Sequence, residues 1–255
     1  MRFKPGLVVL LVAAAIVIVA VVYVLDGKRR EQSIRQASTD VLVQSLRAPD
    51  GEVRGLAAEA LIERRDPASV PPLGGLLRDS DASVREIAAR TLGQMGLPSA
   101  APPLVGALDD PDDSVLSSVV QAIGLIKAPG ATEGLIKALA RKDVGVRTAT
   151  AWVLGAMKAT QAVDPLLELL RDPRGAVRAN AAKALGDIRD RRAVIPLLET
   201  LKDPFAEARG LAAWALGELG DERAVEPLTV LQRDPDPTAR RLAGEALEKI
   251  RRGSG

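Results

Sequence analysis

The stretch "DPRGAVRANAAKALGDIRDRRAVIPLLETLK" occupies residues 172–202, and the next residues, "DPFAEARGLAAWALGELGDERAVEPL" (203–228), repeat its pattern. Taking Arg178 as a reference, the same position recurs every 31 residues. We call it the repeat arginine position; it holds Arg54, Arg85, Leu116, Arg147, Arg178, Arg209 and Arg240. A fixed period of roughly 20–50 residues indicates an array of stacked supersecondary units.

Each repeat is predicted to contain two helices. Asp-Pro pairs at 172, 203 and 234 are predicted to supply an N-cap and a first-turn proline for the helix that carries the arginine. Pro196 then opens the second apolar run, "PLLETL". Gly186 lies inside the first helix, where glycine costs up to about 1 kcal/mol relative to alanine. Because the same column holds Gly93, Gly124, Gly155 and Gly217, we expect the paired helix of the same repeat to pass too close for a Cβ atom.

These residues resemble the HEAT repeat family, in particular the short HEAT-like repeats of the phycobilin lyase type, from about Ser33 to Arg252. The resemblance implies an all-α fold, a right-handed α-solenoid of about seven helical hairpins over residues 41–252. It further implies that the arginine-bearing helices line the concave face, and that Asp and Arg of successive repeats form a buried structural ladder. The expected ladder residues are Arg54, Arg85, Arg147, Arg178, Arg209, Arg240, Asp172, Asp203 and Asp234.

The N-terminal segment predicts a membrane anchor over residues 1–26. Residues 7–25, "LVVLLVAAAIVIVAVVYVL", contain no charge, and a helix of that length spans roughly 28 Å, close to a bilayer core. A cleaved signal peptide is the alternative, but no small-x-small cleavage site follows the apolar run. Residues 27–40 are expected to form a polar linker or the start of a helix.

Flanking charges suggest an orientation for the predicted anchor. Lys28, Arg29, Arg30 and Arg35 follow it, and Arg2 and Lys4 precede it, so the positive-inside rule leans slightly toward a cytoplasmic solenoid. The sequence therefore predicts a single-pass membrane protein that contacts the lipid bilayer through residues 7–25 and has a membrane-associated protein partner.

The composition argues against several kinds of chemistry. The chain has no Cys and no His, so the commonest metal ligands and general base are missing. Residues 36–255 carry 29 basic and 31 acidic side chains, which disfavours nucleic-acid binding. We therefore expect no enzymatic activity, catalytic residue, metal, cofactor, nucleic acid or small-molecule substrate.

Candidate binding residues lie five positions after the repeat arginine. This column reads Glu59, Arg90, Gln121, Trp152, Lys183, Trp214 and Glu245. Its polar members place it toward solvent, where the only two tryptophans of the chain are unusual. They either cover their neighbours as partly buried caps or form an aromatic hot spot on the concave face. The expected partner-binding residues are Trp152, Trp214, Lys183, Arg90 and Gln121.

The third repeat departs from the pattern, because Leu116 replaces arginine and Gly134 replaces proline. A decayed repeat and a partner-contacting repeat both fit. In the first case Leu116→Arg is expected to be tolerated, because the new arginine would face a neighbouring aspartate.

Three functions remain open at this stage. A membrane-anchored protein-binding scaffold, or an accessory subunit of a membrane complex, needs only the anchor, the solenoid and a varied concave face. The alternatives are a phycobilin-lyase-like enzyme and a HEAT-like DNA-binding or glycosylase protein, and a shared fold does not decide between them.

Overall fold

The computed structural model of the chain describes residues 27–29, 31–128 and 130–253, which form helices, turns and loops. The chain divides into two compact units, Met1–Pro72 and Leu73–Gly255. Each repeat has a short and a long helix, and most short helices are preceded by one 3-10 turn. The short helices are α2 (Thr39–Ser45), α4 (Val70–Leu76), α6 (Ala101–Val105), α8 (Thr132–Ala138), α10 (Val163–Leu169), α12 (Val194–Thr200) and α14 (Val225–Leu231).

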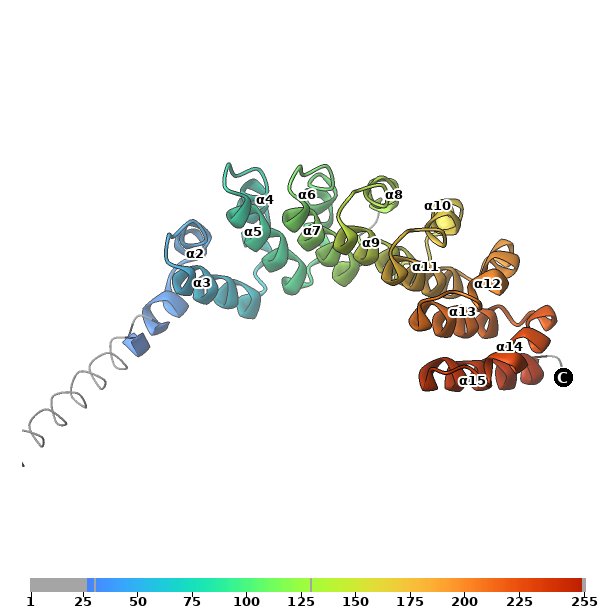
Figure 1. Cartoon of the computed structure of the whole chain (residues 1–255). Helices are drawn as coiled ribbons and strands as arrows, with labels where there is room; N and C mark the ends of the chain where they lie inside the picture. The colour runs from blue at the N-terminus through green and yellow to red at the C-terminus, as the bar shows by residue number, and fades with distance from the viewer. Residues whose placement is uncertain (1–26, 30, 129, 254–255) are drawn as a thin grey trace, which may run out of the picture. The chain divides into compact units, whose positions relative to one another are not determined.

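The long helices carry the repeat arginine position. They are α3 (Gly51–Arg64), α5 (Ala82–Met95), α7 (Asp113–Ile126), α9 (Val144–Ala156), α11 (Gly175–Ile188), α13 (Ala206–Leu219) and α15 (Pro237–Gly253). In the second unit, α5, α7, α9, α11, α13 and α15 pack side by side in sequence order. Figure 1 shows that they form the inner row of that unit and that the short helices form the outer row. The unit is an all-helical repeat solenoid over its described residues.

The predicted glycine column is explained by close contacts between successive long helices. A Cβ atom on Gly93 would lie 2.6 Å from both Cα and Cβ of Ala122 in α7. A Cβ atom on Gly155 would lie 2.6 Å from Cα of Ala184 in α11. Both distances are far below van der Waals contact, which confirms that glycine permits the approach of a packed helix. The approaching element is the long helix of the next repeat. The prediction that the paired helix of the same repeat makes this approach is wrong.

The predicted capping role of the Asp-Pro pairs is wrong. Helix α11 begins at Gly175, its N-cap is Arg174, and Asp172 lies two residues before that cap. The Asp172 carboxylate accepts a hydrogen bond from the Arg174 backbone N–H at 2.8 Å and therefore holds the turn that precedes the helix. Helix α13 follows the same pattern, with Phe205 as its N-cap. The aspartates lie too early in the chain to cap these helices, and their carboxylates also bind arginines of the preceding repeats.

A row of bidentate Arg–Asp pairs joins the long helices to the loops of the following repeats. Arg178 donates from Nε and Nη2 to the two carboxylate oxygens of Asp203, at 2.6 and 2.7 Å. Its Nη1 donates to the carbonyl oxygen of Asp172, six residues earlier, at 2.7 Å. One guanidinium thus ties two consecutive loops together. The same arrangement joins Arg85 to Asp110, Arg147 to Asp172 and Arg209 to Asp234.

The repeat arginines at the two ends of the series bind backbone carbonyls. Arg54, in the first unit, donates from Nη1 to the carbonyl oxygens of Ala48 and Pro49 at 2.7 and 3.0 Å. Arg240, in the last repeat, donates in the same way to Asp234 and Pro235 at 2.7 and 2.9 Å. Arg54 and Arg240 therefore both make the hydrogen bond to the backbone of the preceding loop.

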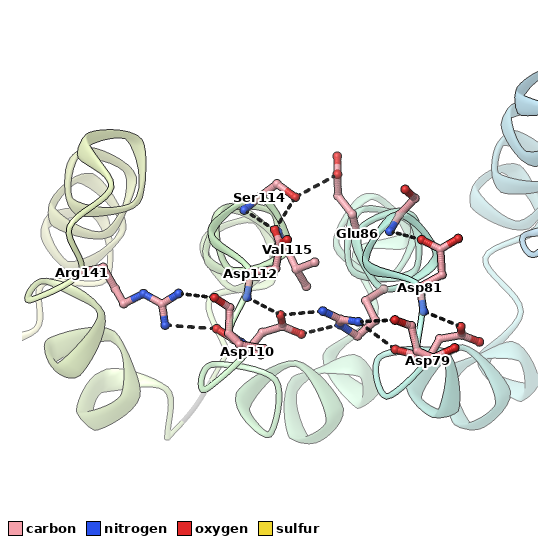
Figure 2. A network of polar contacts seen from close by, with 12 residues as sticks. Asp79, Asp81, Glu86, Asp110, Asp112, Ser114, Val115 and Arg141 are labelled. Atoms are coloured by element: carbon pink, nitrogen blue, oxygen red, sulfur yellow. Dashed lines mark hydrogen bonds and ion pairs between the residues drawn. The ribbon is translucent and has the colours of Figure 1, made fainter.

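The junction between α7 and α9 is built in the opposite sense. Arg141 occupies the column that holds aspartate in neighbouring repeats, and it donates to Asp113 Oδ1 at 2.9 and 2.5 Å. It also donates to the carbonyl oxygens of Asp110 and Pro111 at 3.2 and 2.9 Å (Figure 2). These carbonyls lie six and five residues before Leu116. In the regular repeats, the carbonyls at these two positions accept hydrogen bonds from the repeat arginine. Leu116 is fully buried in place of the missing arginine.

This geometry contradicts the premise of the Leu116→Arg expectation, which was that the new arginine would face a neighbouring aspartate. The residue 25 positions after a regular repeat arginine is the aspartate that binds it, as in Arg85 and Asp110. The residue 25 positions after Leu116 is Arg141. An arginine at 116 would therefore be buried against a like charge, with the loop carbonyls already taken.

The predicted membrane localisation is corrected. Among the residues that the structure describes, no helix is long and apolar enough to cross a bilayer. A span needs about 20 mainly apolar residues, whereas α15, with 17 residues, carries charged side chains along much of its length. The anchor predicted at residues 1–26, with its span at 7–25, lies outside the described residues. This finding does not support the assignment as a single-pass membrane protein with bilayer contacts.

Candidate functional site

The exposed side of the inner helix row is the surface on which the predicted binding residues lie. We call it the inner face and define it by the positions one, five and nine residues after the repeat arginine on α5, α7, α9, α11, α13 and α15. These positions are about one helical turn apart on the same side of each helix. The opposite side of each long helix is buried, as the 0% exposure of Leu92, Leu154, Leu185 and Leu216 shows.

Trp152 and Leu125 are the large apolar side chains that the inner face exposes most. Trp152 on α9 is 48% exposed, and Leu125 on α7 is 63% exposed. The two helices are neighbours in the row. The Trp152 ring leans toward α7, where its Cζ3 atom lies 3.5 Å from the place of a Cβ atom on Gly124. Since Gly124 precedes Leu125, the ring lies beside the turn of helix that presents the leucine.

Trp152 and Leu125 lie on the two neighbouring long helices whose inner-face positions carry no charge. On α7 and α9 the six inner-face positions hold uncharged residues, whereas α5, α11, α13 and α15 each hold at least one charged residue there. We call these six residues the α7–α9 patch. Its members are Ser117, Gln121, Leu125, Thr148, Trp152 and Ala156.

Trp214 has a different environment from Trp152. It is partly buried on α13, and Lys183 of the preceding repeat places Nζ 4.7 Å from the centroid of its ring. Lys183 is also held by a 2.8 Å ion pair with Asp187. A cation–π contact of this kind shields one face of the ring and fixes the lysine. The structure thus brings Lys183 and Trp214 together, and it leaves Trp152 as the more accessible tryptophan.

Arg90 and Gln121 occupy the same column toward the other end of the inner face. Arg90 is exposed, with Nη1 4.0 Å from a carboxylate oxygen of Glu86. Gln121 is exposed and donates from Nε2 to Ser117 Oγ at 3.3 Å. Both side chains are available at the edge of the α7–α9 patch, and neither contributes a core contact.

Most charges along the inner face are neutralised within it. Glu218 on α13 accepts from Arg189 at 2.5 Å and also pairs with Lys249. These hydrogen bonds lower the pKa of Glu218 against the opposing effect of burial, which is the largest influence on it. Arg241 and Glu245 pair at 2.6 Å on α15. The α7–α9 patch therefore lies between stretches whose charges already have partners.

The inner face has a small cavity beside Trp214. A cavity of about 150 Å³ lies beside Trp214 and Glu218, below the roughly 300 Å³ typical of a ligand pocket. Within the described ranges, no group of three or more acidic side chains is placed to hold a metal ion.

Two residues of functional or structural importance were not predicted from the sequence, although each differs in kind from the other residues at its repeat position. Leu125 lies nine positions after the repeat position, in a column that otherwise reads Glu63, Gln94, Ala156, Asp187, Glu218 and Lys249. Arg141 lies in a column that otherwise reads Asp79, Asp110, Asp172, Asp203 and Asp234. Each is the exception to its column, as Leu116 is to the arginines.

Comparison with known families decides the relationship that the repeats suggest. The family model of HEAT repeats matches residues 39–124, 102–176, 132–204 and 163–248. The chain belongs to the HEAT repeat family. This confirms the resemblance drawn from the 31-residue period. No curated protein matches this HEAT-repeat chain.

Solved structures share the fold of this HEAT-repeat chain. The complex of CpcE and CpcF of phycocyanin lyase from a Nostoc species is 24% identical, with a TM-score of 0.53 over 84% of this chain and 95% of that one. YibA from Escherichia coli is 20% identical, with a TM-score of 0.58 over 87% and 95%. A designed armadillo repeat protein in complex with the peptide (KR)4 is 21% identical, with a TM-score of 0.55 over 84% and 100%. At these identities the similarity establishes the fold alone.

Proposed function

We propose that the chain is a protein-binding scaffold that holds a protein or peptide partner on its inner face. The observation that carries this proposal is the α7–α9 patch, where Leu125 and Trp152 expose apolar surface on adjacent helices. About half or more of each residue faces solvent, so neither is enclosed by the array. Exposed aromatic and aliphatic residues with uncharged neighbours are typical of interface centres.

The roles of the other candidate residues follow from their environments. Trp152 and Leu125 act as anchors that a partner buries. Gln121 offers an amide at the edge of the patch, and Arg90 offers a guanidinium one repeat away. The Lys183–Trp214 contact forms a more rigid polar border on the other side. A patch on two neighbouring helices fits a helix or an extended peptide laid across the row.

Affinity purification with substitutions copied from the array itself tests the proposal. Trp152→Gln and Leu125→Gln introduce residues that the preceding repeat already has in the same columns, Gln121 and Gln94. Partners recovered from the source cells with the full-length chain are quantified by mass spectrometry. We expect the double variant to keep its thermal midpoint and to lose its main partner at least tenfold, because a buried aromatic anchor contributes about 2 kcal/mol or more.

Trp214→Gln is the matched control for this experiment. It removes the other tryptophan from the same column, and we expect a smaller loss of partner because that ring is already covered by Lys183. Unchanged recovery with the Trp152→Gln/Leu125→Gln variant would contradict the proposal. A variant that unfolds would show instead that Trp152 and Leu125 belong to the core.

A further inference from the structure

A second apolar surface lies on the outer helix row, between α12 and α14. It is a groove of about 430 Å³ whose walls include Ile195 and Leu198 of α12 and Pro227 and Val230 of α14. Ile195 is 51% exposed and Val230 is 70% exposed, which places both among the most exposed large apolar residues of the described chain. Since the outer row faces away from the inner face, this groove is separate from the α7–α9 patch (Figure 1).

The repeat columns show that both residues are exceptions. The column of Ile195 holds acidic residues in four other repeats and proline in two: Asp40, Glu133, Asp164, Glu226, Pro71 and Pro102. The column of Val230 otherwise holds polar or charged residues or glycine: Gln44, Lys137, Glu168, Glu199, Gly75 and Gly106. Packing of the array therefore does not require an aliphatic side chain in either column. The two exceptions fall in successive repeats and line the same groove.

Carboxylates accompany these aliphatic residues in a regular arrangement. Ile195 and Glu199 are four residues apart on α12, and Glu226 and Val230 are four residues apart on α14, so each helix presents one aliphatic group and one carboxylate on the same side. Within the part of the chain that the structure describes, neither Glu199 nor Glu226 has an ion-pair partner. Lys202 also lies at the groove, so the rim carries a net charge of −1.

We propose that the α12–α14 groove binds a short cationic amphipathic helix. Two neighbouring helices leave a furrow that a third helix can fill, with its aliphatic residues against Ile195 and Val230. Its Lys or Arg residues then pair with Glu199 and Glu226, which the fold leaves unneutralised. This differs from the inner face, where most charged side chains already have partners.

Fluorescence anisotropy with a labelled 14-residue helix of leucine and lysine tests this inference on the full-length chain. A peptide of the same composition in scrambled order is the control for nonspecific charge attraction. We expect Ile195→Gln/Val230→Gln to weaken binding at least tenfold and Glu226→Gln to weaken it less, in a manner that depends on salt. Glu133→Gln, in the same column as Glu226, should bind like the unmodified chain.

Three results would overturn the inference. The Ile195→Gln/Val230→Gln variant could bind the helix normally while remaining folded, or the scrambled peptide could bind equally well. Sedimentation could also show a dimer of the unmodified chain that this variant abolishes, which would make a second copy the occupant. Trp152→Gln serves as an internal check, because helix binding that disappears with this substitution would place the site on the inner face.

Discussion

The α11–α13 and α7–α9 junctions solve the same packing problem with opposite placement of charge. At α11–α13, Arg178 on the long helix reaches forward to Asp203, whose side chain is 8% exposed, and fastens the preceding loop through a carbonyl. At α7–α9, Arg141 in the loop reaches backward to Asp113, whose side chain is 41% exposed, and binds the equivalent carbonyls. Leu116 fills the place of the absent arginine.

The comparison shows that the array requires a guanidinium between successive loops more than it requires arginine at one position. Both junctions provide a guanidinium donor for equivalent loop carbonyl oxygens. The third and fourth repeats also carry the α7–α9 patch. The two repeats that depart from the regular ladder are thus the ones that present Leu125 and Trp152.

The largest expected effect comes from forcing the regular residue into the inverted junction. Leu116→Arg should destabilise the chain by about 3–5 kcal/mol, because it buries a charge that has no carboxylate and lies near Arg141. Urea unfolding followed by circular dichroism measures the loss. A stability within about 0.5 kcal/mol of the unmodified chain would contradict the inverted arrangement.

A second substitution should restore much of this loss. Leu116→Arg combined with Arg141→Asp rebuilds the regular pair in the third repeat. We expect the double variant to be more stable than Leu116→Arg alone, with a favourable coupling energy above about 1 kcal/mol. Strictly additive losses would show that the two positions do not face each other.

A smaller loss of stability is expected when the arginine of either junction is removed, and its size should differ between the two junctions. Arg178→Met should cost about 2–3 kcal/mol, because it leaves the largely buried carboxylate of Asp203 without its partner. Arg141→Met should cost about 1 kcal/mol, because water reaches Asp113 once the pair is broken. Equal losses in urea unfolding, or a larger loss at Arg141, would reverse the comparison.

The smallest effect is an acid dependence of the regular junctions. Hydrogen bonds from Arg209 hold the pKa of Asp234 below its usual value. A carboxyl whose pKa is lower in the folded chain stabilises it above the unfolded value of about 3.9, and this contribution is lost as pH falls through the folded pKa. The free energy of unfolding should therefore decrease below about pH 4. Asp234→Asn should be less stable at pH 7 but show a shallower decrease, and an unchanged slope would contradict this assignment.

The repeat architecture was predictable because packing imposes the same requirement on every unit. The glycine column follows directly from helices that approach within Cβ distance, as at Gly155. The capping role of the Asp-Pro pairs was predicted wrongly because an aspartate before a helix can either cap it or bind a neighbouring arginine. Only the structure shows that Asp172 binds the arginine. The sequence marks such ambiguous residues without giving the direction of their side chains.

The candidate site was predictable in its column and less so in its members. Trp152 and Trp214 share a repeat position, but their exposure depends on the residue in the preceding repeat. Lys183 extends over the ring of Trp214, whereas Gln121 turns back to Ser117. A difference of this kind arises from side-chain length and charge across two helices, so a single column does not reveal it.

Site-specific photo-cross-linking tests the central claim most directly. A benzoylphenylalanine residue is placed at position 152 or 125 of the full-length chain, or at position 133 on α8 as an outer-row control, and the source cells are irradiated. We predict that positions 152 and 125 cross-link to the same protein and that position 133 does not. Cross-links that are absent from 152 and 125, or equally strong from all three positions, would contradict a binding site on the inner face.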